Sequence, residues 1–93
     1  MNKFMLDKED YTLLKSILSQ LSKPIYVYGS RAKGTATRFS DIDLYIDAAI
    51  SEEELEELKA RCEASDLSIK VDLTTNLSPE FLAYIRQDFV LFK

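Results

Sequence analysis

Apolar residues recur at every third or fourth position near the start of the chain, which is the spacing of one face of a helix. Leu14, Ile17 and Leu18 belong to this pattern, and Pro24 follows it as a residue that a helix rarely continues through. Two later segments begin with a serine whose hydroxyl can cap the free N–H groups of a first helical turn. We therefore expect helices over residues 8–22, 51–64 and 79–87, with a short helical turn over residues 30–34.

Other segments alternate apolar and polar residues, which is the period of a β-strand with two different faces. In the clearest of them Ile42 and Leu44 share one face, and the aspartates on either side share the other. We expect strands over residues 25–28, 41–47 and 68–73, and either a short edge strand or a continued helix over residues 89–92. The simplest fold is a mixed α/β protein of the α+β type, a small mixed β-sheet with helices packed on its aliphatic face. The opposite face would stay open, and we call it the acidic face because it carries the aspartates.

Length and composition indicate a single domain over residues 1–93, because 46% of the residues are hydrophobic and can form a small core. The longest apolar run has five residues, whereas a membrane span requires roughly 20. Asp7 interrupts the N-terminal segment before an apolar stretch typical of a secretion signal can form. The one cysteine cannot form an internal disulfide. We therefore expect a cytoplasmic protein without a membrane segment.

The chain contains no histidine, which excludes histidine-dependent nucleophilic catalysis, histidine-bound metals and zinc fingers. Any acid–base or metal chemistry must therefore use carboxylates. The net charge is −4, and affinity for nucleic acid depends on positive charge that neutralises phosphates. We expect no direct binding of nucleic acid.

Three aspartates are candidates for a metal site. Asp41 and Asp43 stand two residues apart on one predicted strand, so their α-carbons lie roughly 6–7 Å apart and their carboxylates point the same way. Mg²⁺ suits such a pair, because it takes one or two protein carboxylates together with water and phosphate oxygens. Asp72 lies on the matching face of the next predicted strand. Taken alone, an aspartate pair of this kind is more often a solvated strand edge.

The end of the first predicted strand is a candidate site for an anion. Gly29 and Ser30 begin a helical turn there, where backbone N–H groups and a hydroxyl can bind a phosphate. Arg31 and Lys33 add positive charge beside the turn. The residues that follow Gly34 do not match a Walker A loop. An ordinary strand-to-helix turn is the alternative interpretation.

The spacing of these residues resembles a known family. Gly29-Ser30, ten intervening residues and Asp41-Ile42-Asp43 resemble the signature of the polymerase-β-type nucleotidyltransferase superfamily. Residues 29–44 are most similar to the minimal nucleotidyltransferases of prokaryotes, and Asp72 falls where the family has its third metal-binding carboxylate. Lys33 stands where the family often has arginine, and it keeps the charge. The resemblance implies the nucleotidyltransferase fold.

The resemblance also implies a reaction, the transfer of AMP from ATP to a hydroxyl with pyrophosphate as the leaving group. It implies two sets of site residues: catalytic residues that bind two Mg²⁺ ions, namely Asp41, Asp43 and Asp72, and nucleotide-binding residues, namely Gly29, Ser30, Arg31 and Lys33. In this assignment Asp72 holds the metal beside the acceptor hydroxyl and can receive its proton.

Minimal nucleotidyltransferases resemble the antitoxins of HEPN–MNT toxin–antitoxin pairs, in which the antitoxin adenylylates a tyrosine of the HEPN ribonuclease. We expect a HEPN-type toxin as the partner, because the catalytic sheet and its helices leave no room in this chain for an acceptor site. Two alternatives stay open. One is a subunit that neutralises its partner by contact alone, with a vestigial metal site. The other is a transferase that modifies a small molecule or an RNA held by another chain.

Overall fold

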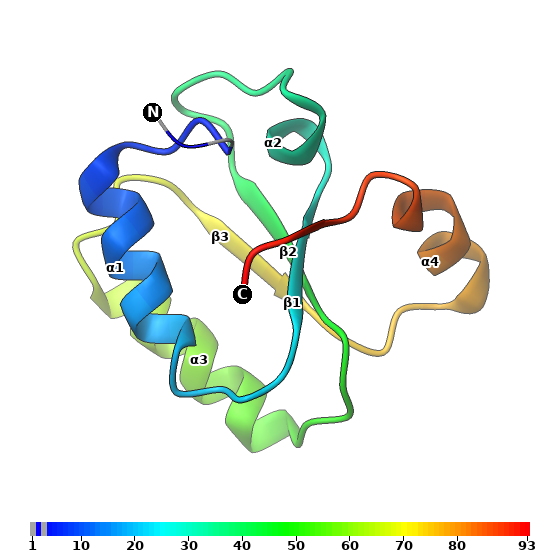
Figure 1. Cartoon of the computed structure of the whole chain (residues 1–93). Coiled ribbons are helices and arrows are strands. Elements are labelled where there is room, and N and C mark those ends of the chain that lie inside the picture. The colour runs from blue at the N-terminus through cyan, green and yellow to red at the C-terminus, as the bar shows by residue number, and fades with distance from the viewer. Residues whose placement is uncertain (1, 3) are drawn as a thin grey trace.

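Helices and strands alternate in the computed structural model, which describes residue 2 and residues 4–93 (Figure 1). The elements in chain order are α1 (Lys8–Leu18), β1 (Ile25–Tyr28), α2 (Ser30–Lys33), β2 (Ile42–Ile46), α3 (Glu52–Ala64), β3 (Val71–Thr74), α4 (Pro79–Arg86) and β4 (Val90–Leu91). The strands of this described part form one sheet in the order β3-β2-β1-β4. β1 is antiparallel to β2 and to β4, whereas β2 and β3 are parallel. The predicted class, a small mixed sheet with helices, is confirmed.

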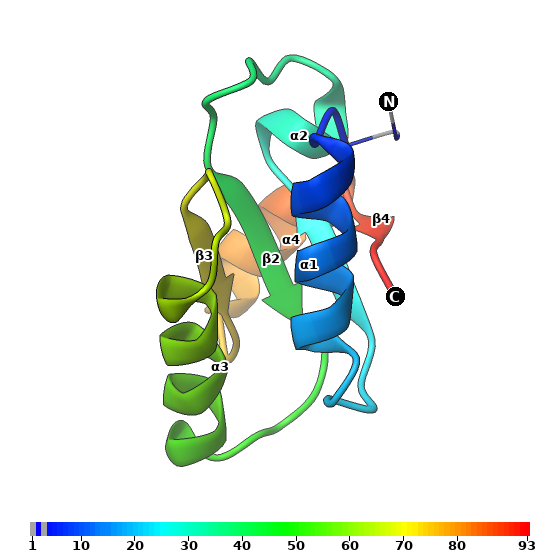
Figure 2. The same ribbon diagram turned by 90° about the vertical axis from the view of Figure 1, so that its left-hand side faces the viewer.

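The main core lies between the aliphatic face of the sheet and the helices α1 and α3, which both cover that face (Figure 2). Fully burying one such aliphatic side chain stabilises the fold by about 1.5–3 kcal/mol. The strands and helices contribute these buried residues to it: Leu14, Ile17, Leu18, Ile25, Val27, Ile42, Leu44, Ile46, Leu58 and Leu73. The alternation of apolar residues along the strands therefore identified the buried face correctly.

Two elements have an end three or more residues from the predicted position. α1 ends at Leu18, and the hydroxyl of Ser19 donates to the carbonyl of Ser16 at 2.7 Å, a local side-chain bond that competes with helix continuation. β3 begins at Val71 rather than at residue 68. Ser68 instead donates from its backbone N–H to the carboxylate of Asp10 in α1, at 3.0 Å. That bond draws the segment before β3 toward the helix.

The ends of the later helices follow the prediction. Ser51 accepts a hydrogen bond from the N–H of Glu54 at 3.1 Å and caps α3. Ser78 accepts one from the N–H of Phe81 at 3.3 Å and caps α4. The last segment pairs with β1 as a short edge strand, the first of the two alternatives considered for it. None of the described helices is long and apolar enough to cross a membrane.

The acidic face is covered at one end by α4, which lies on the side of the sheet opposite α1 and α3 (Figure 2). A second core there contains Tyr28 and Tyr45 of the strands together with Ile85 of α4. The ring of Phe89 stacks on Tyr45 with centroids 5.5 Å apart. The structure differs here from the open face that the sequence predicts, because tyrosine counts as a polar residue in a hydropathy pattern. Its ring is a large apolar surface, and α4 buries it.

Candidate functional site

Two of the three predicted carboxylates lie side by side on the acidic face. Asp43 in β2 is the register partner of Asp72 in β3, and side chains that are partners on one face of a sheet lie next to each other. Asp41 lies just before β2 and is exposed, as Asp72 is, whereas Asp43 is half-buried. The parallel pairing of β2 with β3 therefore brings together residues that are far apart in the sequence.

The carboxylate of Asp43 sits in an unfavourable electrostatic environment. Burial raises its pKa, and so do the negative charges of Asp72 and Asp41 and a side-chain hydrogen bond with Asp72. Like charges in one site disfavour ionisation of all of them, and a bound cation would relieve that repulsion.

An all-oxygen donor set of aspartates fits Mg²⁺ rather than a softer metal. The described residues hold no group of three or more histidine, cysteine, aspartate or glutamate side chains gathered closely enough for a metal ion. Asp43 and Asp72 form a close pair, and Asp41 contributes its charge from the start of the strand. The residue types and the mutual repulsion thus fit the cation, while joint ligation by the three aspartates stays a prediction.

Gly29 allows the turn after β1 to touch this carboxylate pair. A Cβ built on Gly29 would lie 2.5 Å from Oδ2 of Asp43, closer than such atoms approach one another. The backbone of Gly29 has φ +76° and ψ −154°, a conformation that side chains strongly disfavour. Ser30 follows directly and begins α2. The predicted phosphate-binding turn and the predicted metal-binding carboxylate are therefore in contact.

The structure does not support Arg31 as a phosphate ligand. Its side chain is buried, with 1% of its surface exposed. The guanidinium donates hydrogen bonds at 2.7–3.3 Å to five backbone carbonyls, those of Phe4, Met5, Thr37, Arg38 and Ser40. These acceptors occupy the donors that a phosphate would need. Arg31 instead joins the N-terminal segment to the loop that precedes Asp41.

Lys33 is the last residue of α2 and remains at the surface. Its ammonium lies 3.6 Å from a carboxylate oxygen of Asp88, which follows α4. The Lys33 side chain is 49% exposed, so the pair is weak and the ammonium can leave it for a stronger anion at small cost. Asp88 has no signature in the sequence pattern, because only folding brings it beside α2.

Tyr28 lies beside these site residues, although it is outside the glycine–serine and aspartate motif. It is the register partner of Asp43 and is buried beside the carboxylates. Burial raises the pKa of its phenol, the charges of Asp43 and Asp72 raise it further, and a hydrogen bond with Thr74 lowers it. The alternation along β1 predicts this placement, since Tyr28 shares the acidic face and immediately precedes Gly29.

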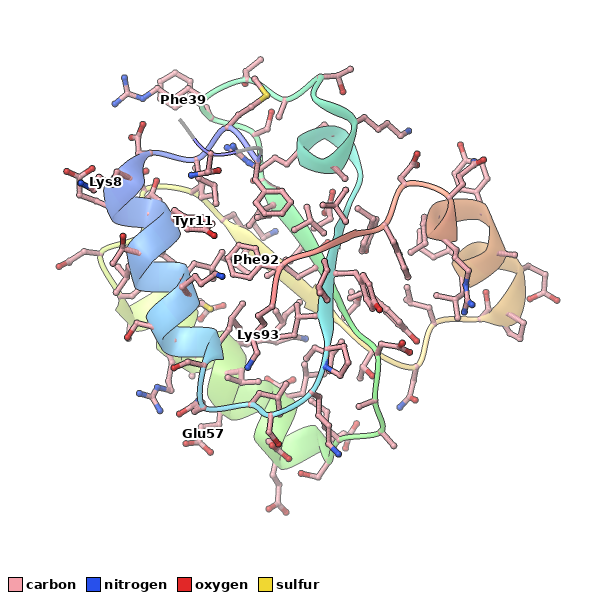
Figure 3. The ribbon with its side chains drawn as sticks, viewed as in Figure 1. Lys8, Tyr11, Phe39, Glu57, Phe92 and Lys93 are labelled. Atoms are coloured by element: carbon pink, nitrogen blue, oxygen red, sulfur yellow. The ribbon has the colours of Figure 1, made fainter. Side chains whose placement is uncertain are left out.

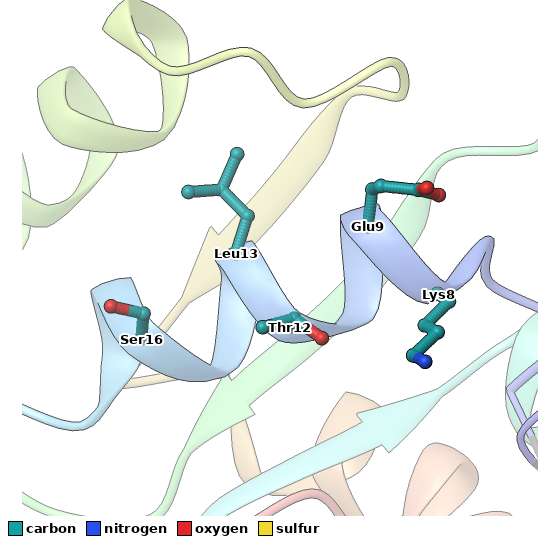
Figure 4. Close-up of a pocket in the computed structure, with 5 residues that line it drawn as sticks. All are labelled: Lys8, Glu9, Thr12, Leu13 and Ser16. Carbon is teal, nitrogen blue, oxygen red and sulfur yellow. The ribbon is translucent and has the colours of Figure 1, made fainter.

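A separate surface pocket of about 540 Å³ lies along α1 (Figure 4). All of the residues that line it belong to that one helix: Lys8, Glu9, Thr12, Leu13 and Ser16. None of the predicted site residues contributes to it. Its lining offers no cluster of carboxylates and no glycine turn, so we do not assign it a role in the chemistry of the acidic face.

Comparisons with known proteins agree with this geometry. The family model for polymerase beta nucleotidyltransferases matches residues 12–91. The chain is 36% identical over 97 residues to a probable protein adenylyltransferase, MntA, from Haemophilus influenzae, covering 95% of this chain and 82% of that protein. Its fold resembles a crystal structure of a toxin–antitoxin with AMP-PNP, with a TM-score of 0.69, 23% identity, and coverage of 89% of this chain and 72% of that one. The chain therefore belongs to the polymerase-β-type nucleotidyltransferase family, as a minimal nucleotidyltransferase of the MNT type.

Proposed function

We propose that this protein transfers AMP from ATP to a tyrosine hydroxyl of a HEPN-type toxin and thereby acts as its antitoxin in the cytoplasm. One observation supports this most: the register pair of Asp43 and Asp72 stands against the Gly29 turn, so carboxylates for a cation and a turn for phosphates meet at one place. The similarity to a protein adenylyltransferase favours AMP and a protein acceptor over other transfers.

In the proposed reaction the acceptor oxygen attacks the α-phosphorus of ATP. A new oxygen–phosphorus bond forms, the bond from the α-phosphorus to the bridging oxygen breaks, and pyrophosphate leaves. When bound, two Mg²⁺ ions would neutralise the triphosphate and lower the pKa of the acceptor hydroxyl. Asp72 accepts the proton of that hydroxyl in this scheme, because it is the exposed member of the carboxylate pair.

The remaining residues bind and orient the nucleotide. Gly29 allows phosphate oxygens to approach the backbone, and Ser30 supplies a hydroxyl at the start of α2. Lys33 balances charge on the leaving pyrophosphate after its ammonium leaves Asp88. Asp41 and Asp43 would hold the cation, which would neutralise negative charge on the triphosphate. Arg31 has no direct part in this scheme, since its donors are already bonded to carbonyls.

A ribonuclease is a suitable partner because the added AMP would inhibit it. Each AMP adds a phosphate to the toxin, and beside a ribonuclease site this charge would repel RNA phosphates and block their binding. A covalently modified toxin would stay inactive after the antitoxin is removed. Inhibition by contact alone would end on separation.

The test is incubation of the protein with labelled ATP, Mg²⁺ and the product of the adjacent gene, which we expect to be the HEPN-type toxin, followed by mass spectrometry of both proteins. We expect one or more additions of AMP on a tyrosine of that protein, and none with the Asp43→Asn variant. A tight complex without label on either protein would leave the contact-only antitoxin. Label on RNA or on a small molecule, with an unmodified protein, would indicate the other class of acceptor.

A further inference from the structure

The most exposed of the large apolar side chains in the described part of the chain belongs to a loop. Phe39 lies between α2 and β2, and 81% of its surface is exposed. Figure 3 shows it at the outside of the molecule, away from both cores. Its neighbour Arg38 is also exposed, with its guanidinium carbon 5.9 Å from the centre of the Phe39 ring. An aromatic residue and an arginine are the residue types most enriched where proteins bind each other tightly.

Hydrogen bonds from the protein interior hold the backbone of this loop in place. Arg31 donates to the carbonyls of Thr37, Arg38 and Ser40 from inside the protein. The N–H of Thr37 donates to the hydroxyl of Ser40 at 2.9 Å, and the N–H of Ser40 donates to the carbonyl of Thr37 at 3.2 Å. The loop is therefore fixed although its residues 37–39 are exposed. A surface fixed before binding loses less conformational entropy when a partner docks.

The loop is also continuous with the site. It ends at Ser40, and the next residue is Asp41, the exposed carboxylate before β2. A protein that grips Phe39 would thus have its adjoining surface over the start of β2. The acceptor hydroxyl must reach the same place in the proposed reaction.

We propose that residues 37–39, with Phe39 as the anchor, are the surface by which the acceptor protein docks. This inference rests on the proposed function and adds to it the place where the partner binds. A partner that binds this surface needs an apolar pocket for the ring of Phe39. Carboxylates or carbonyl oxygens at the edge of that pocket would accept hydrogen bonds from Arg38. The ion pair of Arg38 with Asp7, at 3.6 Å, is exposed and so costs little to exchange for such contacts.

The experiment compares Phe39→Ser with Tyr84→Ser. Tyr84 lies on α4 and is 66% exposed, so it is a matched aromatic control outside the loop. The probe is the product of the adjacent gene, which the proposed function expects to be the HEPN-type acceptor protein. Calorimetry would give the affinity of the complex, and steady-state transfer would give KM for that protein and KM for ATP. Loss of an interface anchor of this kind weakens binding about tenfold or more.

We expect Phe39→Ser to raise the dissociation constant and KM for the acceptor protein together by about tenfold or more, with KM for ATP unchanged. Tyr84→Ser should change neither. Unchanged docking in Phe39→Ser, with an active wild type, would overturn the proposal. So would weaker docking in Tyr84→Ser alone, which would assign the contact to α4.

Two further outcomes are kept apart. If Phe39→Ser abolishes self-association of the isolated chain and leaves the partner's affinity unchanged, Phe39 covers a second copy and the proposal is wrong. If the wild type binds the HEPN-type protein but transfers nothing to it, the proposed reaction fails, and the affinity comparison still decides whether Phe39 is the anchor.

Discussion

Replacement of Gly29 by alanine tests whether the contact between the turn and Asp43 matters. Two effects follow from the geometry. The backbone conformation of φ +76° and ψ −154° costs a non-glycine residue on the order of 1–3 kcal/mol. The new Cβ would also stand 2.5 Å from Oδ2 of Asp43, so the carboxylate must rotate away and loses its place beside Asp72.

The second effect should dominate the activity. A displacement of about 1 Å in a reacting group costs on the order of 10²-fold in rate. We therefore expect Gly29→Ala to lose about 1–3 kcal/mol of unfolding free energy and about 100-fold or more in nucleotide transfer. The loss should fall on kcat and on metal dependence, since the displaced group is a candidate metal ligand.

Gly34→Ala provides the matched control. Gly34 also has a positive φ, +80°, but a Cβ built there has no atom within 4 Å. Its left-handed conformation costs a non-glycine residue roughly 1–2 kcal/mol, similar to the loss at Gly29. We expect Gly34→Ala to lose stability and keep its transfer rate. Both variants also restrict the unfolded chain to the same extent, so this effect cancels in the comparison.

The assays are denaturant unfolding for stability and transfer of labelled AMP under saturating ATP for rate. Equal activity in the two alanine variants would refute the reasoning, because Gly29 would then matter only through its backbone. A lost rate in Gly29→Ala that returns at high Mg²⁺ would show that the displaced carboxylate acts through the cation.

Two further predictions concern the cation and the buried arginine. Asp41→Asn should abolish transfer while its unfolding curve stays close to that of the wild type, since the residue is exposed. Excess chelator should abolish transfer by the wild type, and undiminished transfer there would contradict a metal mechanism. Arg31→Met should lose about 3 kcal/mol or more of unfolding free energy, measured by denaturant titration. Hydrogen bonds to charged groups contribute about 1.5–3 kcal/mol each, and in this variant five backbone carbonyls lose the one guanidinium that they share. A loss below about 1 kcal/mol would mean that water replaces the guanidinium.

The periods of the apolar residues were enough to predict the sheet and its faces. Ile42 and Leu44 are buried and Asp43 lies on the other side, as the alternation requires. The same rule allowed Asp43 and Asp72 to be assigned to one face before their register was known. Such predictions succeed because they depend only on local backbone geometry, which the sequence specifies directly.

The role of Arg31 could not be predicted in the same way. In the sequence it stands beside Gly29 and Ser30, where a positive charge suggests a phosphate. Two of its acceptors are the carbonyls of Phe4 and Met5, which lie far from it in the sequence. Every residue has a backbone carbonyl, so the sequence does not show which carbonyls accept hydrogen bonds from Arg31, and only the folded structure does. The cover of the acidic face by α4 and by Phe89, which follows it, could not be predicted for a related reason, since it depends on contacts between residues far apart in the sequence.

The raised pKa of Asp43 makes the ligand-free site a source of instability, and this has a definite sign. Burial and the charges of Asp72 and Asp41 raise the pKa in the folded protein above its ordinary value of 3.8. The folded state therefore holds this proton more firmly than the unfolded state, and stability falls as pH rises from the ordinary value through the raised one. Below the ordinary value both states are protonated and the cost disappears.

Asp43→Asn should thus unfold at a higher temperature than wild type at neutral pH in chelator, and the difference should shrink toward zero as pH falls below 3.8. Asp47→Asn, at an exposed position just beyond β2, is the control for the loss of one negative charge from the surface. A wild-type protein as stable as Asp43→Asn at neutral pH would mean that the aspartates do not repel one another, and the electrostatic reason for a cation at this site would be lost.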